Sequence, residues 1–239
     1  MKSSITKVVR IALFAIALGV AGWAPASAQV TCGSQTISGQ TIAEALIVDA
    51  GTGTCALINS TVNEGVEVVS GTLSTSNSII FGDISAAPGT SIIVTSTSVF
   101  GKISAEEATA ITVANSKVGD GLESKQSGDV AISGSTLAGI KSEQEASIMA
   151  SDNVLGDKVE VKDTAWPVRL LRNTVGEVTV EKASGIVTIG SNTAFSTIKV
   201  VGNTGATTVN GNTTPKLECS SNNGLSKSGN IVLEDKCLN

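Results

Sequence analysis

A side-chain pattern that recurs about every nineteen residues constrains the fold of this sequence more than any other feature. One column of apolar residues, spaced seventeen to twenty apart, consists of Val62, Ile79, Val99, Val118, Leu137, Leu155, Val175 and Phe195. A small polar residue lies two positions before each of these: Ser60, Asn77, Thr97, Ser116, Ser135, Asn153, Asn173 and Thr193. A second apolar column follows: Val66, Ile84, Ile103, Leu122, Ile140, Val159, Val178 and Ile198. A unit this short cannot bury its own apolar face, so the period predicts a solenoid of stacked coils.

Between the units lie pairs of apolar residues two positions apart, such as Ile92 with Val94 and Ile111 with Val113. Residues two apart point to the same side of a β-strand. Each coil is therefore expected to contain two or three strands of three to five residues, joined by Gly, Ser, Asn and Asp turns. The sequence predicts an all-β chain, a β-solenoid of about eight or nine coils stacked about 4.8 Å apart.

Two other short-period architectures fit less well. A leucine-rich repeat needs a Leu-dominated pattern with an Asn at a fixed place, and neither is present. A left-handed hexapeptide solenoid needs an apolar residue at every sixth position, which this chain does not keep. A single-stranded right-handed parallel β-helix fits better, although these patterns leave the handedness open.

The small polar column has two interpretations. Side chains stacked at the same bend of each coil would bond to one another and satisfy turn amides that are otherwise buried without partners. Exposed turns would give a similar composition, because Ser, Thr and Asn favour turns in general. The fixed position two residues before the apolar anchor favours the buried ladder.

The N-terminal segment 1–28 has the features of a secretory signal peptide. Three cations lie in its first ten residues, an apolar run follows at 11–23, and small residues at 26–28 resemble a cleavage site. The apolar run is short for a membrane span, so we expect an exported chain that begins at Gln29. Without the three cations, the 16 Lys and Arg become 13 against 21 Asp and Glu, a net charge of −8. This charge argues against nucleic acid and anionic membranes as partners.

The four cysteines lie only at the two ends, as Cys32 with Cys55 and Cys219 with Cys237. Each pair is separated by about one coil, which matches the α-carbon distance of a disulfide. Metal binding is the alternative, but the chain has no Cys-x-x-Cys motif and no histidine. We expect one disulfide at each end. The expected organisation is an N-terminal capping coil at 29–55, solenoid repeats at 56–209 and a C-terminal capping coil at 210–239.

Two terminal segments carry a family resemblance. Residues 48–57 contain a strand and a glycine turn that lead to Cys55. Residues 217–223 contain Cys219, and the Gly-Asn turn at 229–230 and Cys237 follow this segment. These segments resemble secreted bacterial proteins with right-handed parallel β-helix repeats. The resemblance implies the fold and export, but no activity. The chain departs from the family pattern by placing Asp, Lys or Glu after several glycines where Asn is expected, as in Gly82-Asp83, Gly101-Lys102 and Gly176-Glu177.

Parallel β-helices also include polysaccharide lyases and hydrolases, so catalytic groups need consideration. The chain has no His and no Tyr, which removes the commonest general base and a common hydroxyl acid. Two carboxylates could suffice for glycoside hydrolysis. Asp83 and Asp120 are expected in one column with Lys102 between them, and Asp157 and Glu177 one coil apart. A surface ladder of alternating charge explains this column without a reaction.

One segment suggests a ligand-binding site. Trp166-Pro167 with Arg169 and Arg172 distantly resembles the Arg-x-Pro-x-x-Arg signature of pectate lyases, although Ala165 replaces the leading arginine. Trp166, Arg169 and Arg172 are therefore the candidate ligand-binding residues. The competing interpretation has the two arginines solvated or paired with carboxylates at positions 160 and 163.

Two further patterns have plain structural interpretations. Phe81 and Phe100 are expected to stack, either as core or rim packing or as a hydrophobic docking patch. Several Gly-Asp pairs offer oxygen ligands for calcium, but the nonapeptide repeat of calcium-binding solenoids is absent. We therefore expect no metal site and no cofactor.

The sequence is best interpreted as an exported, acidic, non-catalytic β-solenoid that acts as a structural or adhesive module at the cell surface or in the periplasm. Its expected partner is a glycan or another surface protein, because rigid repeat surfaces suit extended binding. The alternative is a β-helix polysaccharide lyase or glycoside hydrolase.

Overall fold

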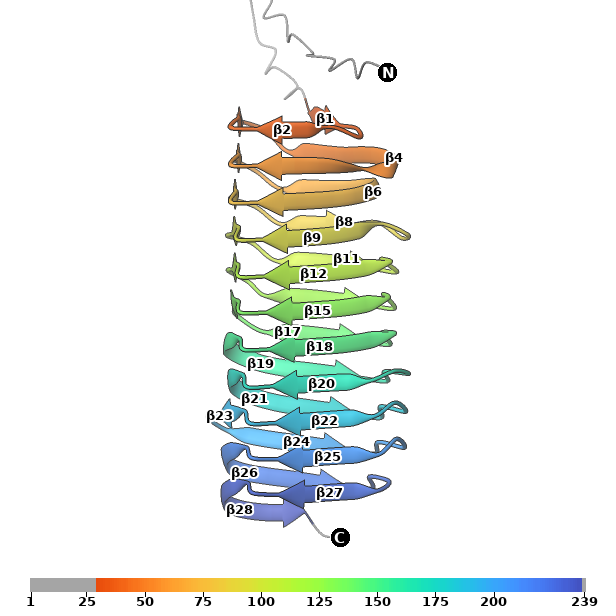
Figure 1. The fold of residues 1–239 in the computed structure, drawn as a ribbon, viewed down its shortest axis with the longest axis vertical. Coiled ribbons are helices and arrows are strands. Elements are labelled where there is room, and N and C mark those ends of the chain that lie inside the picture. Colours follow the sequence, from red (N-terminus) through yellow and green to blue (C-terminus); the bar gives the residue numbers. More distant parts are fainter. Residues whose placement is uncertain (1–28, 238–239) are drawn as a thin grey trace, which may run out of the picture.

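The computed structural model describes residues 29–237, which form one parallel β-solenoid of about 11 turns. The coils stack in register from the N-terminal to the C-terminal end, as Figure 1 shows. The predicted signal peptide lies outside the described residues, as do residues 238–239. Across the described part there is no helix, and hence none that is long and apolar enough to span a membrane.

Each coil contributes strands to three sides of the stack. The side nearest the viewer in Figure 1 is here called the front face. It consists of β2 (Thr36–Ser38), the second half of β4 (Leu46–Ile58) and of β6 (Val66–Ser76), β9 (Ser91–Thr95), β12 (Ala110–Ala114), β15 (Asp129–Ser133), β18 (Ser147–Ser151), β20 (Val168–Leu171), β22 (Val187–Gly190), β25 (Thr207–Asn210) and β27 (Leu225–Ser228).

The opposite side is here called the ion-pair face. It consists of β1 (Val30–Cys32), the first halves of β4 and β6, β8 (Ile84–Ala86), β11 (Ile103–Glu106), β14 (Leu122–Lys125), β17 (Ile140–Glu143), β19 (Val154–Lys162), β21 (Thr174–Glu181), β24 (Thr197–Val201), β26 (Thr213–Ser220) and β28 (Ile231–Cys237). Two-residue strands form the third side: β3 (Thr41–Ile42), β5 (Thr61–Val62), β7 (Ile79–Ile80), β10 (Ser98–Val99), β13 (Lys117–Val118), β16 (Thr136–Leu137) and β23 (Thr193–Ala194), continued by the first residues of β19, β21, β26 and β28.

The predicted β-solenoid is confirmed, but its coils number about 11 and not eight or nine. The sequence pattern missed the terminal coils because they do not repeat its residue types. In the last coil, for example, Lys227 and Asp235 stand in register with the buried apolar residues Val209 and Leu217. Their side chains form an ion pair at 2.8 Å. A terminal coil has a neighbour on one side only, so it is free to carry polar groups that close the stack.

The core is one continuous column of Val, Ile and Leu side chains inside the coils. The second apolar column and the pairs two residues apart are all inward-facing, as predicted. The first apolar column is correct in six coils and wrong in two. Ile79 and Phe195 are exposed, and their neighbours Ile80 and Ala194 occupy the buried positions.

The same one-residue error affects the small polar column in those two coils. The buried polar residues are Ser78 and Asn192, and not Asn77 and Thr193. The residue directly before each buried polar residue has a left-handed backbone, with φ of 48° at Asn77 and 56° at Ser191. Asn and Ser suit both the left-handed position and the buried position after it. At Asn77-Ser78, residue type alone therefore could not fix which of the two neighbours turns inward. In the other coil the predicted Thr193 is the residue after the buried Asn192 and begins β23.

The buried polar column is a hydrogen-bonded ladder, as the sequence indicated. In each coil a side-chain oxygen accepts a bond from the backbone N–H of the ladder residue in the preceding coil, for example Ser116 Oγ from the Thr97 N–H at 3.1 Å. Hydroxyls form the first part of the ladder and asparagines form the remainder: Ser60, Ser78, Thr97, Ser116, Ser135, Asn153, Asn173, Asn192, Asn212 and Asn230. The ladder satisfies one buried amide in every bend.

Both expected disulfides are present. Cys32 and Cys55 have α-carbons 5.8 Å apart, and Cys219 and Cys237 have α-carbons 4.3 Å apart. The C-terminal pair joins register partners in β26 and β28, which are neighbouring strands of consecutive coils. The N-terminal pair instead crosses the interior. It joins Cys32, on the ion-pair face of the first coil, to Cys55, in the second half of β4 on the front face. Each disulfide fixes a terminal coil to its neighbour.

The interior contains one cluster of polar groups without partners. Glu145 is only 1% exposed, and neither carboxyl oxygen has a hydrogen-bond partner. The buried hydroxyls of Ser124 and Ser142, in consecutive coils, are also without partners. Burial raises the pKa of the Glu145 carboxyl, because desolvation penalises the charged form. This carboxyl therefore holds its proton more strongly in the folded chain than in the unfolded chain.

We expect Glu145→Gln to remove a pH-dependent loss of stability. An acid with a raised folded-state pKa stabilises the fold fully below its unfolded value of 4.5, and this contribution is lost as pH rises toward the folded value. The melting temperature of Glu145→Gln should therefore match that of the wild type near pH 4 and exceed it at pH 8. Thermal melts by circular dichroism between these values measure the difference. Glu107→Gln, at an exposed bend, is the matched control and should leave the pH profile unchanged. Parallel profiles for the wild type and Glu145→Gln would contradict the burial of a titrating carboxyl.

Candidate functional site

Charge is concentrated on the ion-pair face. The described residues form 11 salt bridges, and all but two lie on this face or at its border. The two exceptions are Arg172–Asp152 and Lys227–Asp235. Several of the others join adjacent coils: Lys102–Glu123, Lys125–Glu106, Lys141–Glu123, Lys158–Glu177 and Lys199–Glu181. The alternation follows from the stacking, because outward side chains at equivalent positions of parallel strands lie one coil apart.

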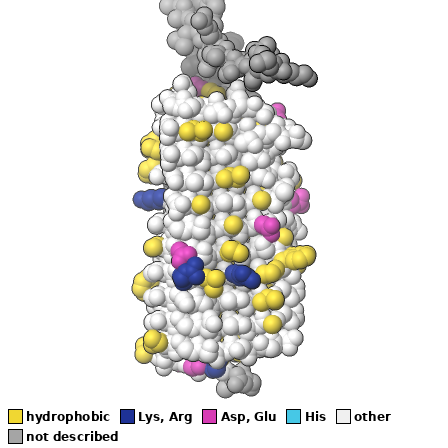
Figure 2. All heavy atoms as spheres, viewed as in Figure 1, with side chains coloured by type: hydrophobic (Ala, Val, Ile, Leu, Met, Phe, Trp, Pro, Cys, Tyr) yellow, Lys and Arg dark blue, Asp and Glu magenta, His cyan; other side chains and the backbone are white. Residues whose placement is uncertain are grey.

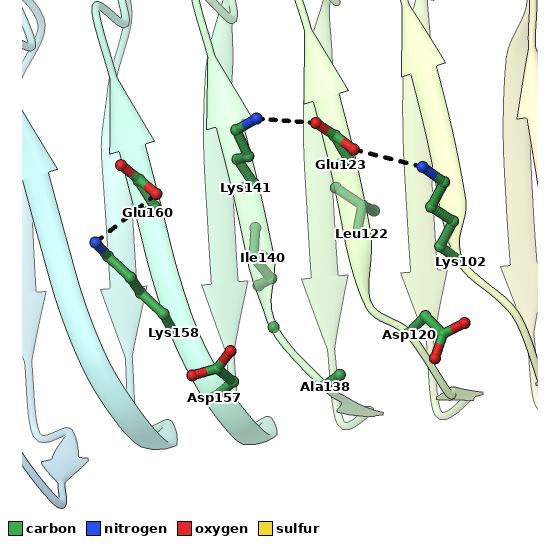
Figure 3. Close-up of a pocket in the computed structure, with 11 residues that line it drawn as sticks. Lys102, Asp120, Leu122, Glu123, Ala138, Ile140, Lys141, Asp157, Lys158 and Glu160 are labelled. Atoms are coloured by element: carbon green, nitrogen blue, oxygen red, sulfur yellow. Dashed lines mark hydrogen bonds and ion pairs between the residues drawn. The ribbon is translucent and has the colours of Figure 1, made fainter.

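A groove of about 290 Å³ opens on this face where it meets the two-residue strands. Lysines and carboxylates from four consecutive coils line it, as Figure 3 shows. Glu123 on β14 lies at its centre, with Lys141 Nζ at 2.9 Å on one side and Lys102 Nζ at 3.6 Å on the other. The small residues Ala138 and Gly139 leave the space that forms the hollow.

Ion pairs favour the ionised forms of three charged groups in the groove, Glu123, Glu160 and Lys141. The hydrogen bond from Lys141 is the main cause of a lowered pKa at Glu123, and the bond from Lys162 lowers the pKa of Glu160. The same contact with Glu123 raises the pKa of Lys141. The groove therefore presents both positive and negative charge to a ligand at neutral pH.

Two aspartates at the edge of the groove have no such partner. Asp120 and Asp157 both lie in the lower part of Figure 3, and neither makes a salt bridge within residues 29–237. They lie two coils apart, at a separation of roughly 10 Å from the coil spacing. The sequence placed Asp120 in one column with Asp83 and Lys102, and that assignment is wrong. Asp83 and Lys102 are equivalent, but the next member of their column is Gly121.

The second expected carboxylate pair is also corrected. Glu177 stands in register with Lys158 and not with Asp157, and the two side chains form a salt bridge at 3.5 Å. An extra residue at the bend before Val159 displaces Asp157 by one position, since the strand register shifts between Leu155 and Lys158. Lys158 and Glu177 therefore form an ion pair between adjacent coils, whereas the alternation expected for Asp83, Lys102 and Asp120 is interrupted at Gly121.

The groove residues Glu123, Lys141 and Glu160 were not singled out from the sequence. Their signal was available, because they are spaced by about one coil and occupy the same register position of β14, β17 and β19. Charged residues at strand positions normally indicate only a solvated face, so their position beside a hollow was visible only in the structure.

The three ligand-binding candidates do not form one cluster. Trp166, which is 64% exposed, lies at the bend before β20. Arg169 points outward from the middle of β20, on the front face. Arg172 lies at the bend after β20, so the strand separates it from Trp166. The expected pairing of Arg172 with a carboxylate at 160 or 163 is wrong.

Arg172 instead binds Asp152, its register neighbour in the preceding coil. Arg172 Nε lies 2.7 Å from Asp152 Oδ1, and one terminal nitrogen lies 2.8 Å from Oδ2. The side-chain hydrogen bond to Arg172 lowers the pKa of Asp152. Both residues have left-handed backbones, so this paired contact joins two strained bends. Arg169 makes no salt bridge with any described residue.

The expected stacking of Phe81 on Phe100 is confirmed, with ring centroids 5.0 Å apart and an interplanar angle of 11°. The rings are about half exposed and lie at the surface, not in the core. Exposed Phe195 occupies the corresponding position five coils after Phe100 along the same bend, and smaller residues lie between Phe100 and Phe195.

Comparison with protein-family models, curated proteins and solved structures gives no match. The functional argument therefore depends on the site itself. Within the described residues there is also no group of three or more His, Cys, Asp or Glu side chains placed to hold a metal ion.

Proposed function

We propose that this chain is an exported structural or binding module, of the secreted bacterial right-handed β-helix repeat type, and that it is not an enzyme. The ionised state of the groove carries the proposal. A general acid that cleaves a glycosidic bond needs a raised pKa, whereas the pKa values of Glu123 and Glu160 are lowered by neighbouring lysines. Fixed charges of both signs are suited to holding a ligand.

Export is supported by the cysteines. All four form disulfides, which persist in oxidising compartments. The signal-like segment 1–28 points the same way, and the cell surface or the periplasm is the proposed location.

A glycan or another surface protein is the proposed partner. Lys102 and Lys141 present ammonium groups on either side of Glu123, an arrangement that suits hydroxyl and carboxylate groups of an acidic sugar. Trp166 and Arg169 are a second proposed contact region, with an apolar ring and a cation that has no salt-bridge partner in the described chain. Arg172 contributes less, because Asp152 occupies its guanidinium.

A polysaccharide hydrolase or lyase is the second candidate. Asp120 and Asp157 favour it, because two carboxylates without salt bridges border one groove at a separation of roughly 10 Å. This lies close to the upper end of the 6.5–9.5 Å range of inverting glycosidases.

A binding and turnover experiment separates the two candidates. The mature chain is tested on an array of acidic and neutral glycans, and for depolymerisation of the same polymers. We expect binding without turnover. Lys102→Met combined with Lys141→Met should weaken binding to an acidic glycan at least about tenfold, since two ammonium contacts are lost. Lys117→Met, at an exposed position on β13 outside the groove, is the control and should leave binding unchanged.

The enzyme candidate makes a different prediction from the same assay. It requires turnover by the wild type that disappears in Asp120→Asn combined with Asp157→Asn, with an unchanged thermal melt. That result would overturn the proposal of a non-catalytic module. Asp163→Asn, at an exposed bend residue that does not line the groove, is the matched control.

A further inference from the structure

The front face differs from the ion-pair face in having almost no charge. On strands β4 to β27 its outward side chains form three parallel columns. The central column is Ala56, Ser74, Ile93, Thr112, Ala131, Met149, Arg169, Thr188, Thr208 and Ser226. The flanking columns add further Ser, Thr and Ala residues, and Asp129 is the only charged residue in them. Figure 2 shows this face with few charged side chains.

Depletion of charge is the compositional signature of the buried centre of a protein interface. Exposed surfaces of soluble domains normally carry about 25–35% charged residues. The front face also exposes apolar side chains, among them Ile93 and Met149, the latter 47% exposed. A flexible thioether packs readily against an irregular partner surface.

The two charges on this face are arranged symmetrically about Met149. Asp129 lies on β15, one coil before the strand that carries Met149, and Arg169 lies on β20, one coil after it. Their signs are opposite. Asp129 accepts a hydrogen bond from Ser147 at 2.6 Å, and Arg169 makes no salt bridge with any described residue.

We propose that the front face is a self-association surface, on which a second copy of this chain packs in antiparallel orientation. A two-fold axis along β18 reverses the order of the coils, so β15 of each copy faces β20 of the other. Met149 then meets Met149 of the second copy. Asp129 meets Arg169 of the second copy, twice by symmetry, as in an isologous dimer. The two charged positions are offset by two residues along the strand, roughly 7 Å, which the long arginine side chain spans.

The size of the face fits this occupant. Reversal about β18 pairs nine strands, β6 to β27. Spaced about 4.8 Å apart and each about five residues wide, they cover roughly 700 Å². Two such faces together bury roughly 1,400 Å², within the range of stable specific interfaces. This inference is independent of the proposed ligand groove, because the groove lies on the ion-pair face. It competes with the second proposed glycan contact, because the dimer would bury Arg169.

Charge reversal tests the proposal. The mature chain should sediment as a dimer in analytical ultracentrifugation at micromolar concentration. Arg169→Asp places four carboxylates at the interface and should raise the dimer dissociation constant at least about tenfold. Asp129→Arg should do the same. The double variant restores both opposite-charge contacts and should recover dimerisation. Lys117→Glu, a charge reversal on β13, is the control and should remain a dimer.

Cross-linking reports the orientation. In the antiparallel dimer Met149→Cys places two thiols across the two-fold axis, so mild oxidation should give a covalent dimer. Thr208→Cys, three coils from the axis on the same column, should not cross-link. A monomer at all concentrations up to about 100 µM would overturn the proposal. A dimer unaffected by both single reversals would also overturn it, as would a glycan that binds this face of a monomer.

Discussion

Deletion of residues 110–128 should leave a folded protein that is shorter by one coil. Ala110 is in register with Asp129, so the deletion removes one complete repeat. Val130 and Ile132 then take the inward positions of Ile111 and Val113. Ser135 replaces Ser116 as the ladder partner of the Thr97 amide. Because each coil contacts only its neighbours, loss of one repeat removes one interface and leaves the others intact.

Deletion of residues 110–118 alone should unfold the chain. This change removes β12 and β13 but keeps β14, so the interrupted coil lacks its front strand and the coils on the two sides of the junction cannot stack in register. Far-ultraviolet circular dichroism and thermal melting compare the two variants. We expect a cooperative melt for the first and none for the second. Equal tolerance of the two deletions would contradict the coil boundaries.

Asn173→Ala should be among the most destabilising single substitutions in the ladder. Its side-chain oxygen accepts bonds from the backbone and side-chain nitrogens of Asn153, at 3.1 and 3.0 Å. Its side-chain nitrogen donates to the Ala150 carbonyl and to Asn192 Oδ1, at 2.9 and 3.0 Å. Alanine leaves buried groups in two neighbouring coils without partners, at about 1–3 kcal/mol for each group.

The expected loss is about 4 kcal/mol, which corresponds to a fall in melting temperature of roughly 10 °C for a chain of this size. Asn63→Ala is the control, since this asparagine is exposed and its side chain makes no hydrogen bond with the described residues. Asn173→Ser should cost less, because serine occupies the ladder in the N-terminal coils. If Asn173→Ala melted like Asn63→Ala, the ladder would not contribute to stability.

Much of the fold was predictable from residue spacing. Pairs such as Ile92 and Val94 lie two residues apart in the repeating coils. Residues with this spacing point to the same side of a β-strand, so the pairs predict one buried strand face. The cysteine pairing followed for a similar reason, because only partners about one coil apart could meet. The wrong assignments occurred at bends such as Asn77-Ser78, where the left-handed position and the buried position accept the same residue types.

The candidate site was less predictable. The register of Asp157 depended on one extra residue at a bend, which shifts the column without changing the repeat length visibly. Asp120 was placed one position away from its true register partner, Gly101. Glu123 gained significance only from the lysines on both sides of it and the hollow beside it.

The sequence by itself determined a repeat of about nineteen residues, the inward columns, the β-solenoid and the two disulfides, because these depend on periodicity along the chain. Only the tertiary structure decided which outward residues become neighbours. It separated Trp166 from Arg172, paired Arg172 with Asp152, buried Glu145 and left the front face nearly without charge. The physical reason is that outward side chains meet across coils, and a single inserted residue at a bend changes which of them align.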